Sequence, residues 1–158
     1  MTVIVGFCAA RSNSGKTTLL LQILKELQQR GKRVAVLKHG RHLDVSDKDS
    51  SRYAAQAAAS LMVSPAGWQL EARPESELAL EQAVELICRV SACDVLLIEG
   101  YKQAAIPKIA VCRKEISLEL PCDPRELRAV VSDEPLALDL PQFGFADIGP
   151  LCDFILQL

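Results

Sequence analysis

The residues best suited to chemistry lie together near the N-terminus, in the segment NSGKTT. It consists of Asn13, Ser14, Gly15, Lys16, Thr17 and Thr18. A chain of phosphates is bound by converging backbone N–H groups, a helix N-terminus, a flexible cation and a hydroxyl that ligates Mg²⁺, and this segment offers each in order. Gly15 lets the backbone approach the phosphates, Lys16 reaches the β- and γ-phosphates, and Thr17 binds the metal ion. The segment therefore predicts a phosphate-binding loop.

Two positions depart from the usual phosphate-loop pattern G-x-x-x-x-G-K-[ST]. Ala10 stands where the pattern has its first glycine, and Asn13 stands where many such loops have another. Asparagine is the non-glycine residue that best tolerates the left-handed backbone conformation, so we expect Asn13 to replace glycine there. Ala10 need only hold the end of the preceding strand. The alternative interpretation is an ordinary turn between a strand and a helix.

An acidic residue, Glu99, ends the apolar run DVLLIE at residues 94–99. A carboxylate at the C-terminal end of a strand beside the phosphate loop can hold Mg²⁺ directly or through water, as the second acidic motif of P-loop proteins does. We therefore expect Glu99 to be a metal ligand together with Thr17. A solvated acid at a strand end is the alternative.

A second carboxylate, Asp133, follows the run VVS and bears on the choice of base. A carboxylate can accept hydrogen bonds from both N1 and N2 of guanine, a pairing that adenine cannot make. Asp133 is therefore a candidate for GTP preference. The alternative is that it caps the turn before Pro135.

The elements that must position these residues follow from the spacing of apolar side chains. We expect strands at residues 2–8, 33–38, 94–98, 108–112 and 127–131, a hairpin of 61–64 with 68–72, and helices at 16–30, 51–60, 77–90 and 149–158. Gly31 is placed to end the first helix. This alternation predicts an α/β fold with a doubly wound, mostly parallel sheet of the P-loop NTPase type, carrying a β-hairpin insertion. In such sheets ligands bind beyond the carboxyl ends of the strands.

Length and charge limit the function classes. The 158 residues fit one nucleotide-binding domain, residues 1–158, which can bury a core without disulfides or structural metal. A formal charge of −2, from 18 Lys and Arg against 20 Asp and Glu, is too balanced for a protein that coats nucleic acid or an anionic membrane. No apolar run approaches the roughly 20 residues that span a bilayer. The N-terminus lacks a basic region before its apolar run, so we expect a cytoplasmic protein whose six cysteines are mostly small buried side chains.

Several motifs together resemble one known family. They are GKTT after the first strand, Lys38-His39, KDS at residues 48–50, EGYK at residues 99–102 and PKI at residues 107–109. This combination is similar to molybdopterin-guanine dinucleotide biosynthesis protein B, the MobB family, over nearly the whole chain. The resemblance implies a Mg²⁺-dependent, GTP-binding P-loop protein, usually a homodimer and a weak GTPase. It further implies a partner, the molybdopterin guanylyltransferase that attaches GMP to molybdopterin.

The polar loop after the second strand offers further candidates. We interpret it as a switch loop in which Asp49 reaches Mg²⁺ or the attacking water and His39 reaches the γ-phosphate or substrate. The alternative is a transition-metal site at His39 and His42, although an irregular loop fixes no ligand geometry. Lys102, with Lys108 and Arg113, forms a candidate basic patch for a second anion such as the pterin phosphate, and solvated surface charge is the alternative.

Arg11 lies five residues before Lys16. In P-loop proteins with a deviant phosphate loop, a lysine at that offset reaches across a dimer to the partner's nucleotide. Arg11 can neutralise charge that develops during hydrolysis, or it is a solvated side chain. Three other functions remain open: a P-loop small-molecule kinase, a metallochaperone GTPase, and a non-catalytic module that binds nucleotide only as a structural ligand.

Overall fold

The computed structural model describes residues 1–40, 52–53, 55–72 and 75–158. Contacts within the chain divide it into two compact units. The larger unit comprises Met1–His39 and Leu80–Leu158, and the smaller unit comprises Gly40–Ala79. That the whole chain acts as one nucleotide-binding domain stays a prediction.

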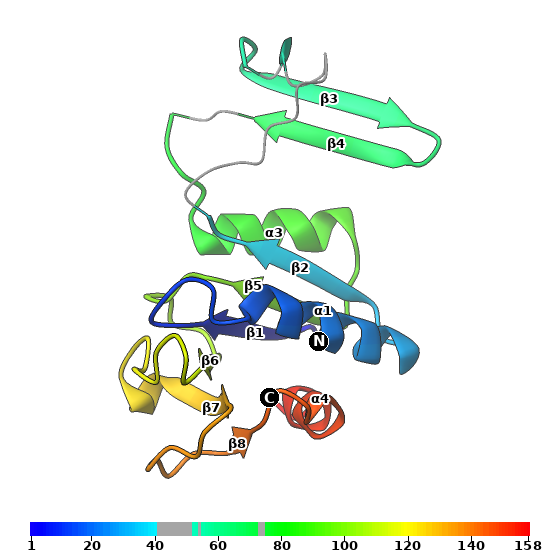
Figure 1. The fold of residues 1–158 in the computed structure, drawn as a ribbon. Helices are drawn as coiled ribbons and strands as arrows, with labels where there is room; N and C mark the ends of the chain where they lie inside the picture. Colours follow the sequence, from blue (N-terminus) through cyan, green and yellow to red (C-terminus); the bar gives the residue numbers. More distant parts are fainter. Residues whose placement is uncertain (41–51, 54, 73–74) are drawn as a thin grey trace. The chain divides into compact units, whose positions relative to one another are not determined.

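A parallel sheet forms the centre of the larger unit (Figure 1). Its strand order is β2-β5-β1-β6-β7-β8, and every neighbouring pair is parallel. The strands are β1 (Val3–Cys8), β2 (Val34–Lys38), β5 (Val95–Glu99), β6 (Lys108–Cys112), β7 (Leu127–Ser132) and β8 (Gln142–Phe143). Sheet and flanking helices confirm the predicted doubly wound α/β fold. Because β1 lies inside the sheet, the loop that follows it emerges between the ends of β5 and β6.

Helices cover both faces of this sheet. Helix α1 (Lys16–Gln29) and helix α4 (Ile148–Ile155) pack together on one face, over side chains such as Val5 and Val111. Helix α3 (Leu80–Val90) covers the other face, where Leu80 packs with Leu96 and Ile98. The helix begins three residues later than the predicted range 77–90. A short helix, η1 (Pro124–Glu126), precedes β7.

A glycine with a left-handed backbone conformation flanks α1 at each end. Gly15 precedes the helix with φ +83°. Gly31 follows it with φ +74°, its N–H donating to the carbonyl of Gln28, while the N–H of Lys32 donates to that of Leu27. These two bonds form a Schellman motif, which confirms Gly31 as the helix stop.

The smaller unit contains an antiparallel hairpin of β3 (Ala59–Ser64) and β4 (Gly67–Ala72), as predicted. The predicted helix over residues 51–60 is wrong beyond its start. Only residues 52–53 are helical among those described, residues 55–58 form turns and bends, and strand β3 begins at Ala59. Alanine favours helix, but Tyr53 is the one large apolar side chain of this run and is exposed, and pairing with β4 takes the last two residues. Within the described residues, no helix has the length and apolar character needed to cross a bilayer.

Candidate functional site

The predicted phosphate loop lines a cavity of about 470 Å³ at the carboxyl end of the sheet. The lining residues are Ser12, Asn13, Ser14, Gly15, Lys16, Thr17, Thr18, Lys38 and Glu99. Every predicted loop residue from Asn13 to Thr18 therefore faces the same space. The cavity lies where ligands of parallel α/β sheets bind.

The backbone of the loop has the conformation that its residues predict. Asn13 has φ +61° and Gly15 has φ +83°, so asparagine does occupy a left-handed position. Ser14 is buried, and its hydroxyl donates to the carbonyl of Arg11 at 2.8 Å, which fixes the middle of the loop. The first N–H groups of α1 lack intrahelical partners and carry its positive dipole end. The loop therefore presents N–H donors to the cavity, and phosphate binding there stays a prediction.

The two predicted metal ligands meet at this cavity. The Thr17 hydroxyl lies 3.2 Å from both Oε1 and Oε2 of Glu99. Strand pairing produces this contact, because Glu99 is the last residue of β5 and is in register with Phe7 of β1 and Lys38 of β2. One hydroxyl and one carboxylate are oxygen ligands that suit Mg²⁺, so the donor set fits this ion.

A second cavity of about 300 Å³ lies at the ends of β7 and β8. It is lined by Ser132, Asp133, Glu134, Pro135, Gln142, Phe143 and Gly144. Asp133 Oδ1 accepts from the backbone N–H of Lys114 at 2.8 Å, and its Oδ2 has no hydrogen-bond partner among the described residues. The turn before Pro135 is capped instead by the hydroxyl of Ser132, which accepts from the Glu134 N–H at 3.2 Å. Ser132 therefore caps this turn, and Asp133 lines the cavity; its role in base recognition stays a prediction.

A scan against protein families matches residues 4–133 to the model "MobB: Molybdopterin guanine dinucleotide synthesis protein B". The chain belongs to the MobB family. It is 36% identical to the molybdopterin-guanine dinucleotide biosynthesis adapter protein of Escherichia coli K12, covering 94% of this chain and 89% of that protein. It is 33% identical to the Haemophilus influenzae adapter protein, and the match covers 91% of this chain and 83% of that protein.

Solved structures agree with this assignment. Bacillus subtilis MobB superposes with a TM-score of 0.74 at 26% identity, covering 98% of this chain and 96% of that one. A MobB homologue from Bacillus stearothermophilus has the same TM-score at 24% identity. That match covers 99% of this chain and 100% of the homologue, and it supports the fold. The MobB resemblance read from the sequence motifs is therefore confirmed.

The remaining predicted residues have mixed outcomes. The centre of the His39 ring lies 4.4 Å from that of Tyr101. The backbone N–H of His39 donates to the backbone carbonyl of Glu99, so His39 lies beside the metal-ligand candidate. Lys102 Nζ donates to the carbonyl of Ala10 at 3.3 Å, which places its charge at the start of the phosphate loop. Arg11 is exposed. Asp49 and His42 lie outside the described residues.

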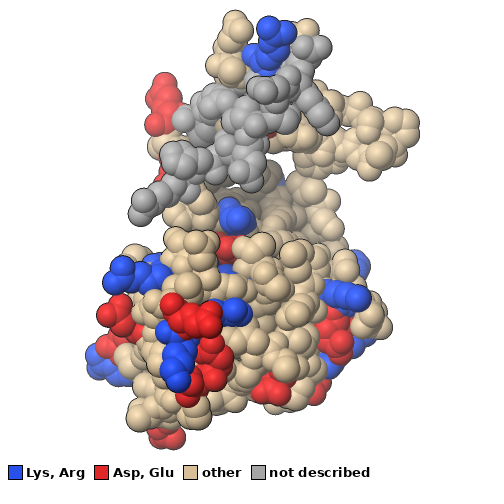
Figure 2. Space-filling model, in the orientation of Figure 1, with Lys and Arg blue, Asp and Glu red and all other residues tan. Residues whose placement is uncertain are grey.

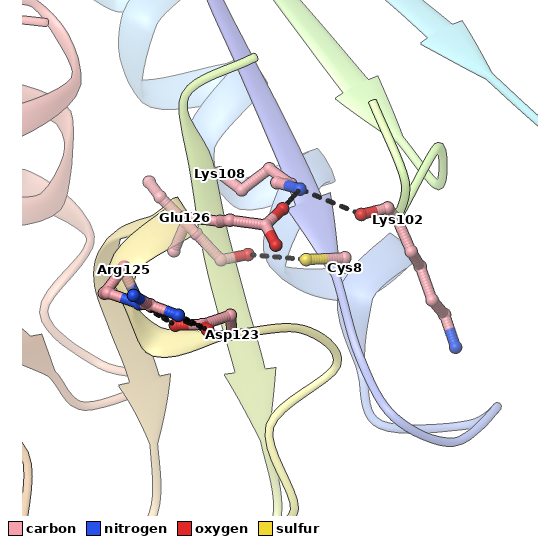
Figure 3. A network of polar contacts seen from close by, with 7 residues as sticks. Cys8, Lys102, Lys108, Asp123, Arg125 and Glu126 are labelled. Atoms are coloured by element: carbon pink, nitrogen blue, oxygen red, sulfur yellow. Dashed lines mark hydrogen bonds and ion pairs between the residues drawn. The ribbon is translucent and has the colours of Figure 1, made fainter. Parts of the chain in front are cut away.

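The prediction that Lys108 belongs to an exposed basic patch is wrong, because this lysine is buried. Its side chain is only 1% exposed, and its amine donates to Glu126 Oε2 at 2.6 Å and to the Lys102 carbonyl at 2.9 Å (Figure 3). Strand β6 is buried on both faces, so a residue at its start must be buried too. Nearby Cys8 is also buried, and burial raises the pKa of its thiol to about 12.

Two residues take places that the sequence does not predict, since Lys38 is noted there only within a family motif and Arg113 only within a basic patch. Lys38 lines the phosphate cavity because it ends β2 beside Glu99, a position that only strand order reveals. Arg113 lies against Gly15, where a methyl group added to the glycine would be 2.9 Å from Nη2. Ninety-seven residues separate the two in the chain. Among the residues that the structure describes, no three His, Cys, Asp or Glu side chains gather as a metal site.

Proposed function

We propose that this chain is a GTP-binding adapter in molybdenum cofactor biosynthesis, which assists the attachment of GMP to molybdopterin. Membership of the MobB family supports the proposal. The relatives from Escherichia coli and Haemophilus influenzae are both named molybdopterin-guanine dinucleotide biosynthesis adapter proteins. These matches span most of the chain, including both cavities.

The observation that carries the proposal is the contact between Thr17 and Glu99 at the mouth of the phosphate loop. Thr17 opens the first turn of α1, and Glu99 ends the strand next to β1. A cation between these oxygens would sit beside phosphates held by the loop, so the two side chains can bind Mg²⁺ and nucleotide together. An ordinary turn between a strand and a helix does not require this pair.

Each predicted residue then has a role in binding. The loop N–H groups from Asn13 to Thr18 hold the β-phosphate, and Lys16 neutralises the β- and γ-phosphates. Thr17 and Glu99 hold Mg²⁺, with Asp49 as a further metal or water ligand. Asp133 accepts N1–H and N2–H of guanine, which selects GTP. Bound Mg²⁺ would polarise the γ-phosphate, so slow GTP hydrolysis is part of the proposal.

The proposal includes a homodimer, for which the hairpin of the smaller unit gives support. One face of the hairpin carries two opposed pairs of apolar side chains, Leu61 with Leu70 and Val63 with Trp68. These four side chains are between 49% and 72% exposed. An apolar surface of this kind is typical of an interaction site, and an isolated two-stranded hairpin is marginally stable. A cytoplasmic location completes the proposal, since six free cysteines suit a reducing compartment.

The test is reconstitution with the guanylyltransferase, molybdopterin, Mg²⁺ and GTP at a concentration that limits the enzyme alone. We expect the added protein to raise the rate of dinucleotide formation, and a Lys16→Ala variant to lose the effect. Lys25→Ala, an exposed lysine on the same helix, is the matched control and should behave as wild type. An equal rate with and without the wild-type protein contradicts the proposal.

A further inference from the structure

Arg113 follows β6, packs against Gly15 of the phosphate cavity and stacks on Phe145, a chain neighbour of the residues that line the second cavity. A Cβ added to Gly15 would lie 2.9 Å from Arg113 Nη2. The guanidinium therefore packs directly against Gly15, which lines the phosphate cavity. Its Cζ lies 4.4 Å from the centre of the Phe145 ring. Phe145 directly follows Phe143 and Gly144, which line the second cavity.

Among the described residues, the guanidinium stacks on a ring but makes no hydrogen bond. Its Nε is buried without a hydrogen-bond partner, and the described residues offer Arg113 no ion pair. A buried donor that is left unsatisfied destabilises a fold, so such a group calls for an explanation. Stacking on Phe145 orients the guanidinium plane and satisfies none of its N–H groups.

The placement of Arg113 suggests which part of a nucleotide it faces. The phosphate loop takes the β- and γ-phosphates, and the cavity beside Asp133 takes the base. A single nucleotide that occupies both must place its sugar and α-phosphate between them. Arg113 touches one residue of the first cavity and a chain neighbour of the second. Its next residue, Lys114, holds Asp133 through the backbone.

We propose that Arg113 is a nucleotide-binding residue that donates to the α-phosphate. This inference rests on the proposed GTP site and extends it. The guanidinium fork matches the geometry of phosphate oxygens, and stacking on Phe145 already restricts its freedom before the nucleotide arrives. No covalent step is involved, because the role is binding alone.

The experiment compares guanosine, GMP, GDP and GTP binding to wild type and Arg113→Gln, by competition against a fluorescent GDP analogue. A charge-assisted hydrogen bond predicts about a tenfold or greater loss of affinity. The loss should be similar for GMP, GDP and GTP, which share the α-phosphate, and absent for guanosine. Arg128→Gln, an exposed arginine on β7, is the control and should bind as wild type.

A second readout separates ligand binding from a structural role. Without nucleotide, Arg113→Gln should melt near the wild-type temperature, because the variant removes both an unsatisfied buried donor and the stacking on Phe145. With GDP, it should gain less thermal stability than wild type. Unchanged GMP affinity, an equal loss for guanosine, or a gain in stability with GDP equal to that of wild type overturns the inference. Failure of wild type to bind any guanine nucleotide instead overturns the proposed function.

Discussion

Single residues determine whether the cavity at the phosphate loop can hold a metal ion. Thr17 and Glu99 come from different elements, yet the hydroxyl lies 3.2 Å from both carboxylate oxygens. A hydroxyl that is already beside a carboxylate needs little rearrangement to share a cation with it. The pair thus links two predictions that the sequence makes separately.

Thr17→Val tests the hydroxyl with almost no change in shape. We expect the variant to fold normally, because residue 17 is exposed, and to lose most of the increase in GTP affinity that Mg²⁺ provides. The loss should be about tenfold or more with Mg²⁺ and small with EDTA, since only the metal contact is removed. Fluorescence titration with and without the metal measures both values. A Mg²⁺ dependence equal to that of wild type would contradict the assignment.

Asp133→Asn tests base selection. The amide cannot accept two hydrogen bonds from guanine, so we expect the preference for GTP over ATP to fall about tenfold or more. Asp139→Asn, at an exposed position in the same loop region, should leave the preference unchanged. Competition titrations with both nucleotides give the ratio. Wild-type selectivity in Asp133→Asn would place base recognition elsewhere.

Among the helices and strands, those whose own residues carry a clear pattern could be predicted from the sequence. Three elements have a signal within their own residues, so they could be predicted: β1 from the apolar run at residues 2–8, the phosphate loop from GKTT, and the end of α1 from Gly31. Strand β8 has only two residues and shows no periodicity. The burial of Lys108 depends on Glu126, eighteen residues away, and on strand order. Side-chain type alone predicts an exposed lysine, so that partnership could not be read from the sequence.

The Lys108–Glu126 pair yields a stability prediction at this scale (Figure 3). Glu126→Ala leaves the buried amine with only the Lys102 carbonyl and should lower the free energy of unfolding by about 1–3 kcal/mol. Glu126 is 48% exposed, which argues for the lower part of that range. Urea unfolding measures the change. Arg125→Ala, which breaks the exposed pair with Asp123 in the same short helix, is the control and should have little effect. An equally small effect of Glu126→Ala would show that Lys108 does not depend on its carboxylate.

At the scale of the whole molecule, charge and surface decide what the protein can associate with. On the face shown in Figure 2, basic and acidic side chains are interspersed over the larger unit, in keeping with the net charge of −2. Such a surface gives no broad electrostatic attraction for nucleic acid. The apolar face of the hairpin offers a different kind of contact, which the proposed homodimer would use.

Arg11 provides the prediction that depends on assembly. If it reaches the partner's nucleotide in a dimer, Arg11→Ala should lower the GTPase rate more than GTP affinity, because it acts on charge that develops during hydrolysis. Mixing this variant with Lys16→Ala should restore activity at one of the two composite sites. Hydrolysis assays of each variant alone and of the mixture give the comparison. Equal rates for wild type and Arg11→Ala, or a protein that remains monomeric with GTP, would rule this out.

We propose that the phosphate loop, with Thr17 and Glu99, forms a Mg²⁺-dependent guanine nucleotide site. Calorimetric titration of the wild-type chain with GTP, GDP and ATP, each with and without Mg²⁺, tests this site. We predict one site per chain, tighter binding of GTP than ATP, a gain in GTP affinity with Mg²⁺, and loss of GTP binding in a folded Lys16→Ala variant. No binding of any nucleotide, or unchanged GTP affinity in Lys16→Ala, would contradict the claim.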